Sequence, residues 1–140
     1  MIRRSTMQDL EDVYQLTCEL ENDELPYAAF VRIYKNQMRD DRHACLVCVA
    51  DDRIVGFLNM RFEEQLHHTA RIAEILEFSV RTSERSRGIG KDLFTAACAL
   101  AKEHGCEQIE AASNQKRTDA HRFYMREGMQ NSHYKLTRKL

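Results

Sequence analysis

The sequence predicts one domain of mixed α/β or α+β class, in which helices pack on a single central sheet. Its 140 residues are the size of one ordinary domain. Runs rich in β-branched and apolar residues, such as 44–50 and 54–62, differ sharply from the helical spacing of Leu93, Ala97 and Leu100. No repeat, linker or low-complexity segment interrupts them. We therefore expect residues 1–140 to form a single domain.

Local signals set the bounds of the expected elements. Thr6 begins a capping sequence at a helix start, and Pro26 suits the first turn of a second helix. Gly105 and Gly128 are typical helix terminators, whereas Gly56 marks a candidate bulge within a strand. The expected order is strand 2–4, two helices, strands 44–50, 54–62 and 71–80, helix 91–104, strand 107–113, helix 119–126 and a final alternating strand 133–140.

Composition excludes several classes of function. Twenty-one basic residues against 22 acidic ones give a net charge of −1, so the electrostatic attraction that drives nucleic-acid binding is absent. The longest apolar stretches have the length of strands, so we expect no membrane anchor. The N-terminus lacks the apolar middle of a secretory signal, which predicts a cytoplasmic protein. The odd number of cysteines, 5, indicates reduced thiols, and we interpret Cys45 and Cys48 as core residues.

Two acids interrupt the apolar strand 71–80, and they are candidates for acid–base chemistry. Glu74 and Glu77 are three residues apart, so on a regular strand their side chains face opposite ways. One would then line a cleft while the other is solvated, unless a bulge changes the alternation. The alternative interpretation is that both are ordinary exposed acids.

The same strand runs into a glycine-rich turn and then directly into a helix. A turn of this kind presents free backbone N–H groups and the positive end of the helix dipole, which favours an anion such as a pyrophosphate. Arg85, Arg87 and Lys91 are available to assist with phosphates, or are simply solvated cations. The turn matches neither a Walker loop nor the dinucleotide fingerprint, which argues against nucleotide hydrolysis and hydride transfer.

The motif Arg85-x-x-Gly88-x-Gly90 after an acid-bearing strand resembles the coenzyme-A-binding motif of the GNAT superfamily of N-acetyltransferases. Asn114 after the next strand, and Tyr124 on the helix that Gly128 ends, follow the order of that family. The resemblance covers nearly the whole chain. It implies acetyl-CoA as cosubstrate and a mixed, mostly antiparallel sheet flanked by helices, splayed between the fourth and fifth strands.

Residue roles follow from the resemblance. Glu74 stands 13 residues before Arg87, as the base does in family members that carry it on this strand, so it ranks ahead of Glu77. Tyr124 is the expected acid for the leaving thiolate, or else a core aromatic residue beside Phe123. The expected acetyl-CoA-binding residues are Ser79, Val80, Arg85, Arg87, Gly88, Ile89, Gly90, Lys91 and Asn114.

A closer resemblance is carried by Leu66-His67-His68, Asn114-x-Lys116-Arg117, Arg126-Glu127-Gly128 and Ser132-His133. These segments resemble those of the family members that acetylate aminoalkylphosphonates, which implies a small primary amine as acceptor. The candidate acceptor-binding residues are His67, His68, Lys116, Arg117 and His133, and we expect no metal site. Aminoglycosides, polyamines and protein N-termini are alternative acceptors. A non-catalytic sensor of acetyl-CoA is an alternative of another class. The family often dimerises, so a homodimer is compatible with the resemblance, and we expect neither nucleic-acid nor membrane partners.

Overall fold

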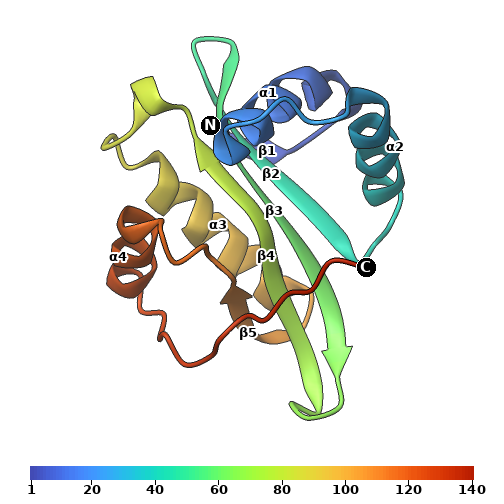
Figure 1. Cartoon of the computed structure of the whole chain (residues 1–140), viewed down its shortest axis with the longest axis vertical. Coiled ribbons are helices and arrows are strands. Elements are labelled where there is room, and N and C mark those ends of the chain that lie inside the picture. Colours follow the sequence, from blue (N-terminus) through green and yellow to red (C-terminus); the bar gives the residue numbers. More distant parts are fainter. The chain divides into compact units, whose positions relative to one another are not determined.

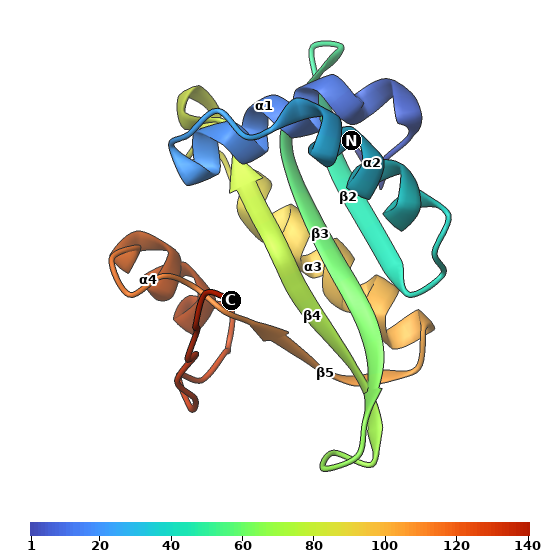
Figure 2. The ribbon, with the colours of Figure 1, turned by 45° about the vertical axis from the view of Figure 1, so that its right-hand side comes forward.

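The computed structural model describes all residues 1–140, and its central element is a five-stranded sheet in the order β1-β2-β3-β4-β5 (Figure 1). The strands are β1 (Ile2–Arg4), β2 (His43–Ala50), β3 (Arg53–Gln65), β4 (Ala70–Val80) and β5 (Cys106–Ala111). Neighbouring strands are antiparallel except β4 and β5, which are parallel. Figure 2 shows β5 beside β4 at its start and diverging from it farther on. The mixed, splayed sheet predicted from the sequence is thus confirmed.

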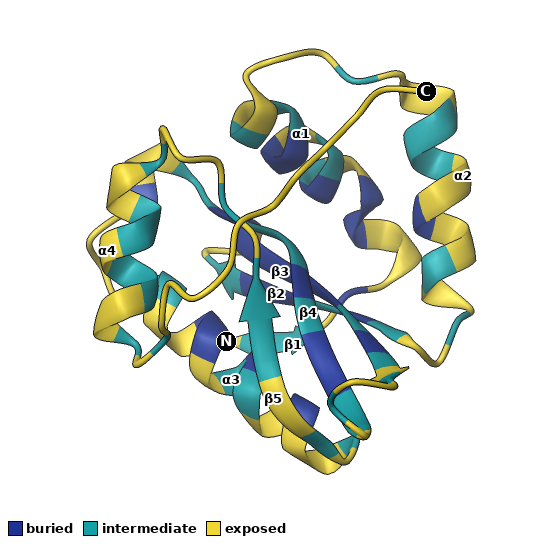
Figure 3. Ribbon diagram, turned by 60° about the horizontal axis from the view of Figure 1, so that its bottom comes forward, coloured by how far each residue is buried: buried dark blue, intermediate teal, exposed yellow.

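Helices cover both faces of this sheet. They are α1 (Leu10–Glu21), α2 (Tyr27–Met38) and α3 (Ile89–Glu103), while α4 (Thr118–Arg126) belongs to a separate unit of the chain. α1 and α2 lie on one face, where Val13 and Leu16 pack with Phe57 of β3. α3 lies on the other face, where Phe62 stacks on the His104 ring. Buried residues gather on the central strands and on the inner sides of α1 and α3 (Figure 3). No helix is long and apolar enough to cross a membrane.

The residue contacts divide the chain into two compact units, Met1–Glu110 and Ala111–Leu140. The second unit contains α4, which ends before Gly128 at a φ of 90°. The prediction of a final strand at 133–140 is wrong, since these residues are exposed and form no strand. Their sequence alternates as a strand does, but alternation alone does not supply a neighbouring strand to bond to.

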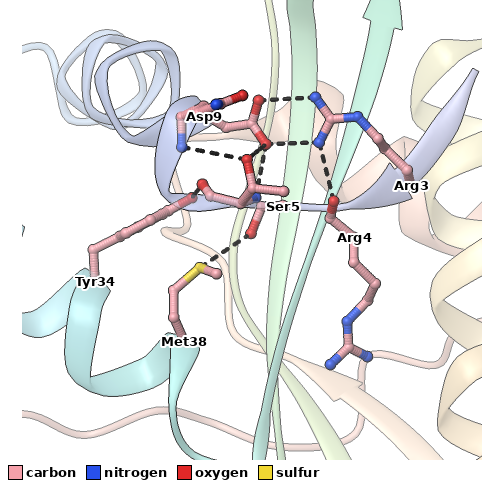
Figure 4. A network of polar contacts seen from close by, with 8 residues as sticks. Arg3, Arg4, Ser5, Asp9, Tyr34 and Met38 are labelled. Atoms are coloured by element: carbon pink, nitrogen blue, oxygen red, sulfur yellow. Dashed lines mark hydrogen bonds and ion pairs between the residues drawn. The ribbon is translucent and has the colours of Figure 1, made fainter.

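The capping sequence at Thr6 forms as predicted and connects three elements of the first unit (Figure 4). The Asp9 carboxylate accepts a hydrogen bond from the Thr6 amide and lies 2.7 Å from the Arg3 guanidinium. That guanidinium lowers the pKa of the buried Asp9 carboxyl. The Tyr34 hydroxyl of α2 donates to the Thr6 carbonyl at 2.8 Å. Together these contacts hold α1 and α2 over the end of β1.

Gly56 is required by close packing between β3 and the start of α3. A Cβ atom at this position would lie 3.1 Å from both the Ser79 carbonyl oxygen and the Leu93 side chain. The predicted irregularity is also present, because the β2–β3 register shifts between Cys48 and Val49, directly opposite Gly56. The end of β4 and the beginning of α3 are thereby held close together.

Candidate active site

A bulge in β4 brings both candidate acids to the same face of the sheet. Asn59 pairs with Glu77 and Arg61 with Glu74, while the register shifts between Asn59 and Met60. Asn59 and Arg61 are two residues apart on β3, so their side chains share a face, and so do those of their partners. The alternation expected for a regular strand does not hold here, because Leu76 is an extra residue in the ladder and forms the bulge that was named as the exception.

Glu77 is held by a hydrogen-bonded chain that reaches α2. Asn59 Nδ2 donates to Glu77 Oε2 at 2.9 Å and to Gln37 Oε1 at 2.9 Å. No hydrogen bond is made by the second carboxylate oxygen of Glu77. Burial raises the pKa of Glu77, and the Asn59 amide opposes that rise. A carboxylate with a raised pKa and a free oxygen is well suited to accept a proton near neutral pH.

Glu74 lies in a different environment. Its Oε2 atom is 2.8 Å from Arg61 Nη2, and the Glu74 side chain is 30% exposed. Arg61 also lies 3.2 Å from Glu63, so the three side chains form a surface ion-pair cluster. Glu74 thus already has a cationic partner, whereas Glu77 has none.

A cavity of about 260 Å³ lies between α1, α2 and the sheet, and Glu77 and Asn59 line it. Cys45 of β2 pairs with Asn59, which in turn pairs with Glu77, so the three residues form a row across the sheet. Burial raises the pKa of the Cys45 thiol to about 12. The same effect raises the pKa of the Tyr34 phenol to about 12. Both groups are therefore neutral at physiological pH. Glu77 is the only carboxylate among the lining residues.

The glycine-rich turn has the geometry of an anion site. α3 begins at Ile89 without a side-chain cap, and its first bond runs from the Asp92 amide to the Gly88 carbonyl. The amides just before Asp92 therefore remain available. Gly88 has a φ of 80° and would have nothing within 4 Å of an added Cβ atom, so the turn is open. The Ser79 hydroxyl at the end of β4 is buried without a hydrogen-bond partner.

The cationic side chains of this turn differ in whether an acidic side chain of the protein already binds them. Arg87 is 2.7 Å from Glu84, which also binds Arg53 and whose pKa these two arginines lower. Arg85 donates only to the Val80 carbonyl, and Lys91 is exposed. Arg85 and Lys91 are thus the side chains best placed to meet an anion, together with the Gly90 amide at the helix start.

The paired histidines lie far from Glu77. His67 and His68 occupy the turn between β3 and β4, where His68 is 3.9 Å from Glu110. At ~3.3 Å per residue, the strand between this turn and Glu77 spans roughly 23 Å. The structure does not bring these histidines together with the candidate base.

The remaining predicted residues belong to the second unit. Asn114 closes a turn there, with its side-chain oxygen accepting from the Lys116 amide and its backbone oxygen from the Arg117 amide. Its side-chain amide nitrogen makes no hydrogen bond. Burial raises the pKa of Tyr124 to about 12. His133 is exposed and lies 2.7 Å from the Ser132 hydroxyl.

Comparison with known proteins identifies the family. The model of the acetyltransferase (GNAT) family matches residues 7–129. The aminoalkylphosphonate N-acetyltransferase of Salmonella typhimurium is 36% identical over 139 residues, which are 99% of this chain and 90% of that protein. The chain is a GNAT acetyltransferase. The superfamily and the acetyl-transferring activity predicted from the sequence are therefore confirmed.

Solved structures agree with the fold of this GNAT acetyltransferase. The crystal structure of a Bacillus halodurans transcriptional regulator is 29% identical, with a TM-score of 0.91, and the match covers 100% of this chain and 99% of that one. An aminoglycoside N-acetyltransferase in complex with CoA is 18% identical, with a TM-score of 0.90, covering 100% and 93% of the two chains. The second likeness is one of fold alone.

Sequence reasoning missed the residues that hold the GNAT base candidate in place. Asn59 is a polar residue inside the apolar run 54–62, and a polar group in such a run must find a partner when buried. That signal was available in the sequence. Gln37 gives no comparable signal, because a glutamine near the end of an amphipathic helix is usually exposed.

Proposed function

We propose that this GNAT acetyltransferase transfers the acetyl group of acetyl-CoA to the primary amine of a small aminoalkylphosphonate, with Glu77 as the general base. The observation that carries the proposal is the Glu77 carboxylate, which lines a cavity with a raised pKa and one oxygen unpaired. Glu74 is the other candidate base, but its ion pair with Arg61 makes it the weaker one. We expect the reaction to take place in the cytoplasm.

Glu77 removes the proton that prevents the amine from reacting. An alkylammonium group has a pKa of ~10.4, so its nitrogen carries no free lone pair near pH 7 until a base accepts a proton. Glu77 lines the cavity that an acceptor would enter, and the Asn59 hydrogen bond to one of its oxygens fixes the orientation of the carboxylate. The neutral amine is then able to attack the acetyl carbonyl.

Acetyl-CoA supplies the activated acetyl group, and the turn at 85–91 fits its pyrophosphate. The support is the uncapped start of α3, the open position at Gly88 and the buried Ser79 hydroxyl without a partner. In this assignment Gly88, Ile89 and Gly90 offer backbone amides, while Arg85 and Lys91 offer charge. Arg87 acts less directly, since Glu84 already binds it.

Tyr124 donates the proton that the departing thiolate needs. Because burial raises its pKa to about 12, the phenol is fully protonated at neutral pH. A CoA thiol resembles cysteine, with a pKa of ~8.5, so it is acidic enough to leave while sharing that proton. The family order of Asn114, Tyr124 and Gly128 supports this assignment.

The phosphonate acceptor rests on the relative at 36% identity and on the size of the cavity. At ~30 Å³ for each water-sized group, 260 Å³ holds roughly eight such groups, which suits the amine-bearing end of a small acceptor. The aminoglycoside N-acetyltransferase structure does not favour the larger acceptor, because its likeness concerns the fold.

Thiol release from acetyl-CoA tests the proposal. The panel contains aminomethylphosphonate, 2-aminoethylphosphonate, kanamycin, spermidine and a short peptide. We expect the two phosphonates to give the highest kcat/KM. Turnover led by another amine would replace the acceptor and keep the reaction. Thermal stabilisation by acetyl-CoA with no thiol release from any amine would favour a sensor instead.

A further inference from the structure

The cavity beneath α1 and α2 is larger than one amino group needs, and much of its wall is apolar. Val13 of α1, Phe30 and Ile33 of α2 and Phe57 of β3 contribute aliphatic and aromatic side chains. Room for roughly eight water-sized groups therefore lies next to the Glu77 carboxylate, within the same cavity. An acceptor whose amine meets Glu77 would place neighbouring carbon atoms against this wall.

The hydroxyl groups along the cavity are already bonded within the protein. Thr17 Oγ1 donates to the Val13 carbonyl at 2.7 Å, and the Tyr34 hydroxyl donates to the Thr6 carbonyl at 2.8 Å. Ser5 Oγ donates to the Met38 sulfur at 3.8 Å. A polar ligand group placed beside them would gain little, whereas an alkyl group would bury apolar surface without leaving these hydroxyls unpaired.

The inner part of the cavity is a poor place for a phosphonate. Two basic residues line the cavity, Arg4 and His43. Arg4 is exposed to solvent, and the His43 ring lies 3.4 Å from the Asp40 carboxylate. A phosphonate dianion beside Glu77 would meet a carboxylate, whereas the exposed Arg4 offers a cation nearer to solvent.

We infer that this cavity is an alkyl subsite of the acceptor. It takes a short, unbranched chain carried by the amine-bearing carbon, with the amine at Glu77 and the phosphonate outside. The inference rests on the proposed function, and it narrows the acceptors to primary amines with such a chain. Cys45 sits on the cavity floor beside Asn59, so the size of its side chain sets the space left for the chain.

The test measures kcat/KM for two series of amines. One contains 1-aminoalkylphosphonates whose chain grows from hydrogen to propyl, and the other contains n-alkylamines from methylamine to pentylamine. In the natural protein, we expect each added methylene to raise kcat/KM by about fourfold until the cavity is full. Cys45→Met should lower the ratio of kcat/KM for the longest acceptor to kcat/KM for the shortest at least tenfold, and Cys45→Ala should raise this ratio. A purely structural effect would change all members of a series equally.

The outcomes separate this inference from the proposed function. Phosphonate turnover with a ratio that neither variant changes would overturn the alkyl subsite and leave the phosphonate acceptor standing. Turnover of n-alkylamines alone, with the ratio shifting as expected, would support the subsite and overturn the phosphonate acceptor. No acetylation in either series would overturn both. If Cys45→Met does not fold, Ile33→Phe on the outer side of the cavity, where Ile33 is 46% exposed, makes the same test.

Discussion

Replacing Glu77 by glutamine should leave an enzyme that acetylates only the acceptor molecules whose amine is already uncharged in solution. Glu77→Gln keeps the shape of the side chain and an oxygen that accepts from Asn59, but it removes the ability to take up a proton. With an acceptor pKa of ~10.4, only about 0.1% of the amine is neutral near pH 7.4. We therefore expect kcat/KM at that pH to fall about 10³-fold, within the range of general-base effects.

The pH dependence makes this prediction specific. The neutral fraction rises about tenfold for each pH unit below the amine pKa, so Glu77→Gln should recover about a hundredfold between pH 7.4 and 9.4. Thiol release measured across this range gives the profile, and acetyl-CoA affinity should stay unchanged. Glu74→Gln is the matched control, since it breaks an exposed pair worth only about 0–1 kcal/mol. A Glu77→Gln profile that follows the natural protein, or a larger loss in Glu74→Gln, would refute the reasoning.

Three further substitutions test other parts of the site. Asn59→Ala removes the hydrogen bond that lowers the pKa of the base, so the acidic limb of the kcat/KM–pH profile should move to higher pH; an unmoved limb would contradict the role of the amide. Tyr124→Phe should lower kcat by about 10²-fold while acetyl-CoA affinity, measured by calorimetry, is largely kept; unchanged kcat would remove Tyr124 as the acid. Gly56→Ala forces a Cβ atom to 3.1 Å from a backbone oxygen, and it should lower the free energy of unfolding in urea by about 1–3 kcal/mol. A urea midpoint of unfolding equal to that of the natural protein would show that the neighbouring atoms move aside without a cost in stability.

Local signals predicted most of the elements of the first unit. The capping box at Thr6 forms, Pro26 stands immediately before α2, and Gly105 ends α3 with a φ of 77°. Asp51 and Asp52 adopt positive φ angles in the turn between β2 and β3, as a tight hairpin requires. These features depend on a few neighbouring residues, so their residue types were sufficient evidence. The strand predicted at 133–140 does not form, because a strand also needs a neighbouring strand to pair with, and no local sequence pattern specifies that partner.

The sequence by itself determined the family, the glycine-rich turn before the third long helix and the presence of two acids on one strand. Only the tertiary structure showed that these acids differ in their surroundings, because the β3–β4 pairing places Glu74 beside Arg61 and Glu77 beside Asn59. It also assembled the cavity from α1, α2 and the sheet, whose residues lie far apart along the chain. Helix caps and turns are set by neighbours in sequence. Strand register, ion-pair partners and cavity walls are set by long-range packing. A one-residue shift in the pairing of two strands is enough to move a side chain to the other face of the sheet.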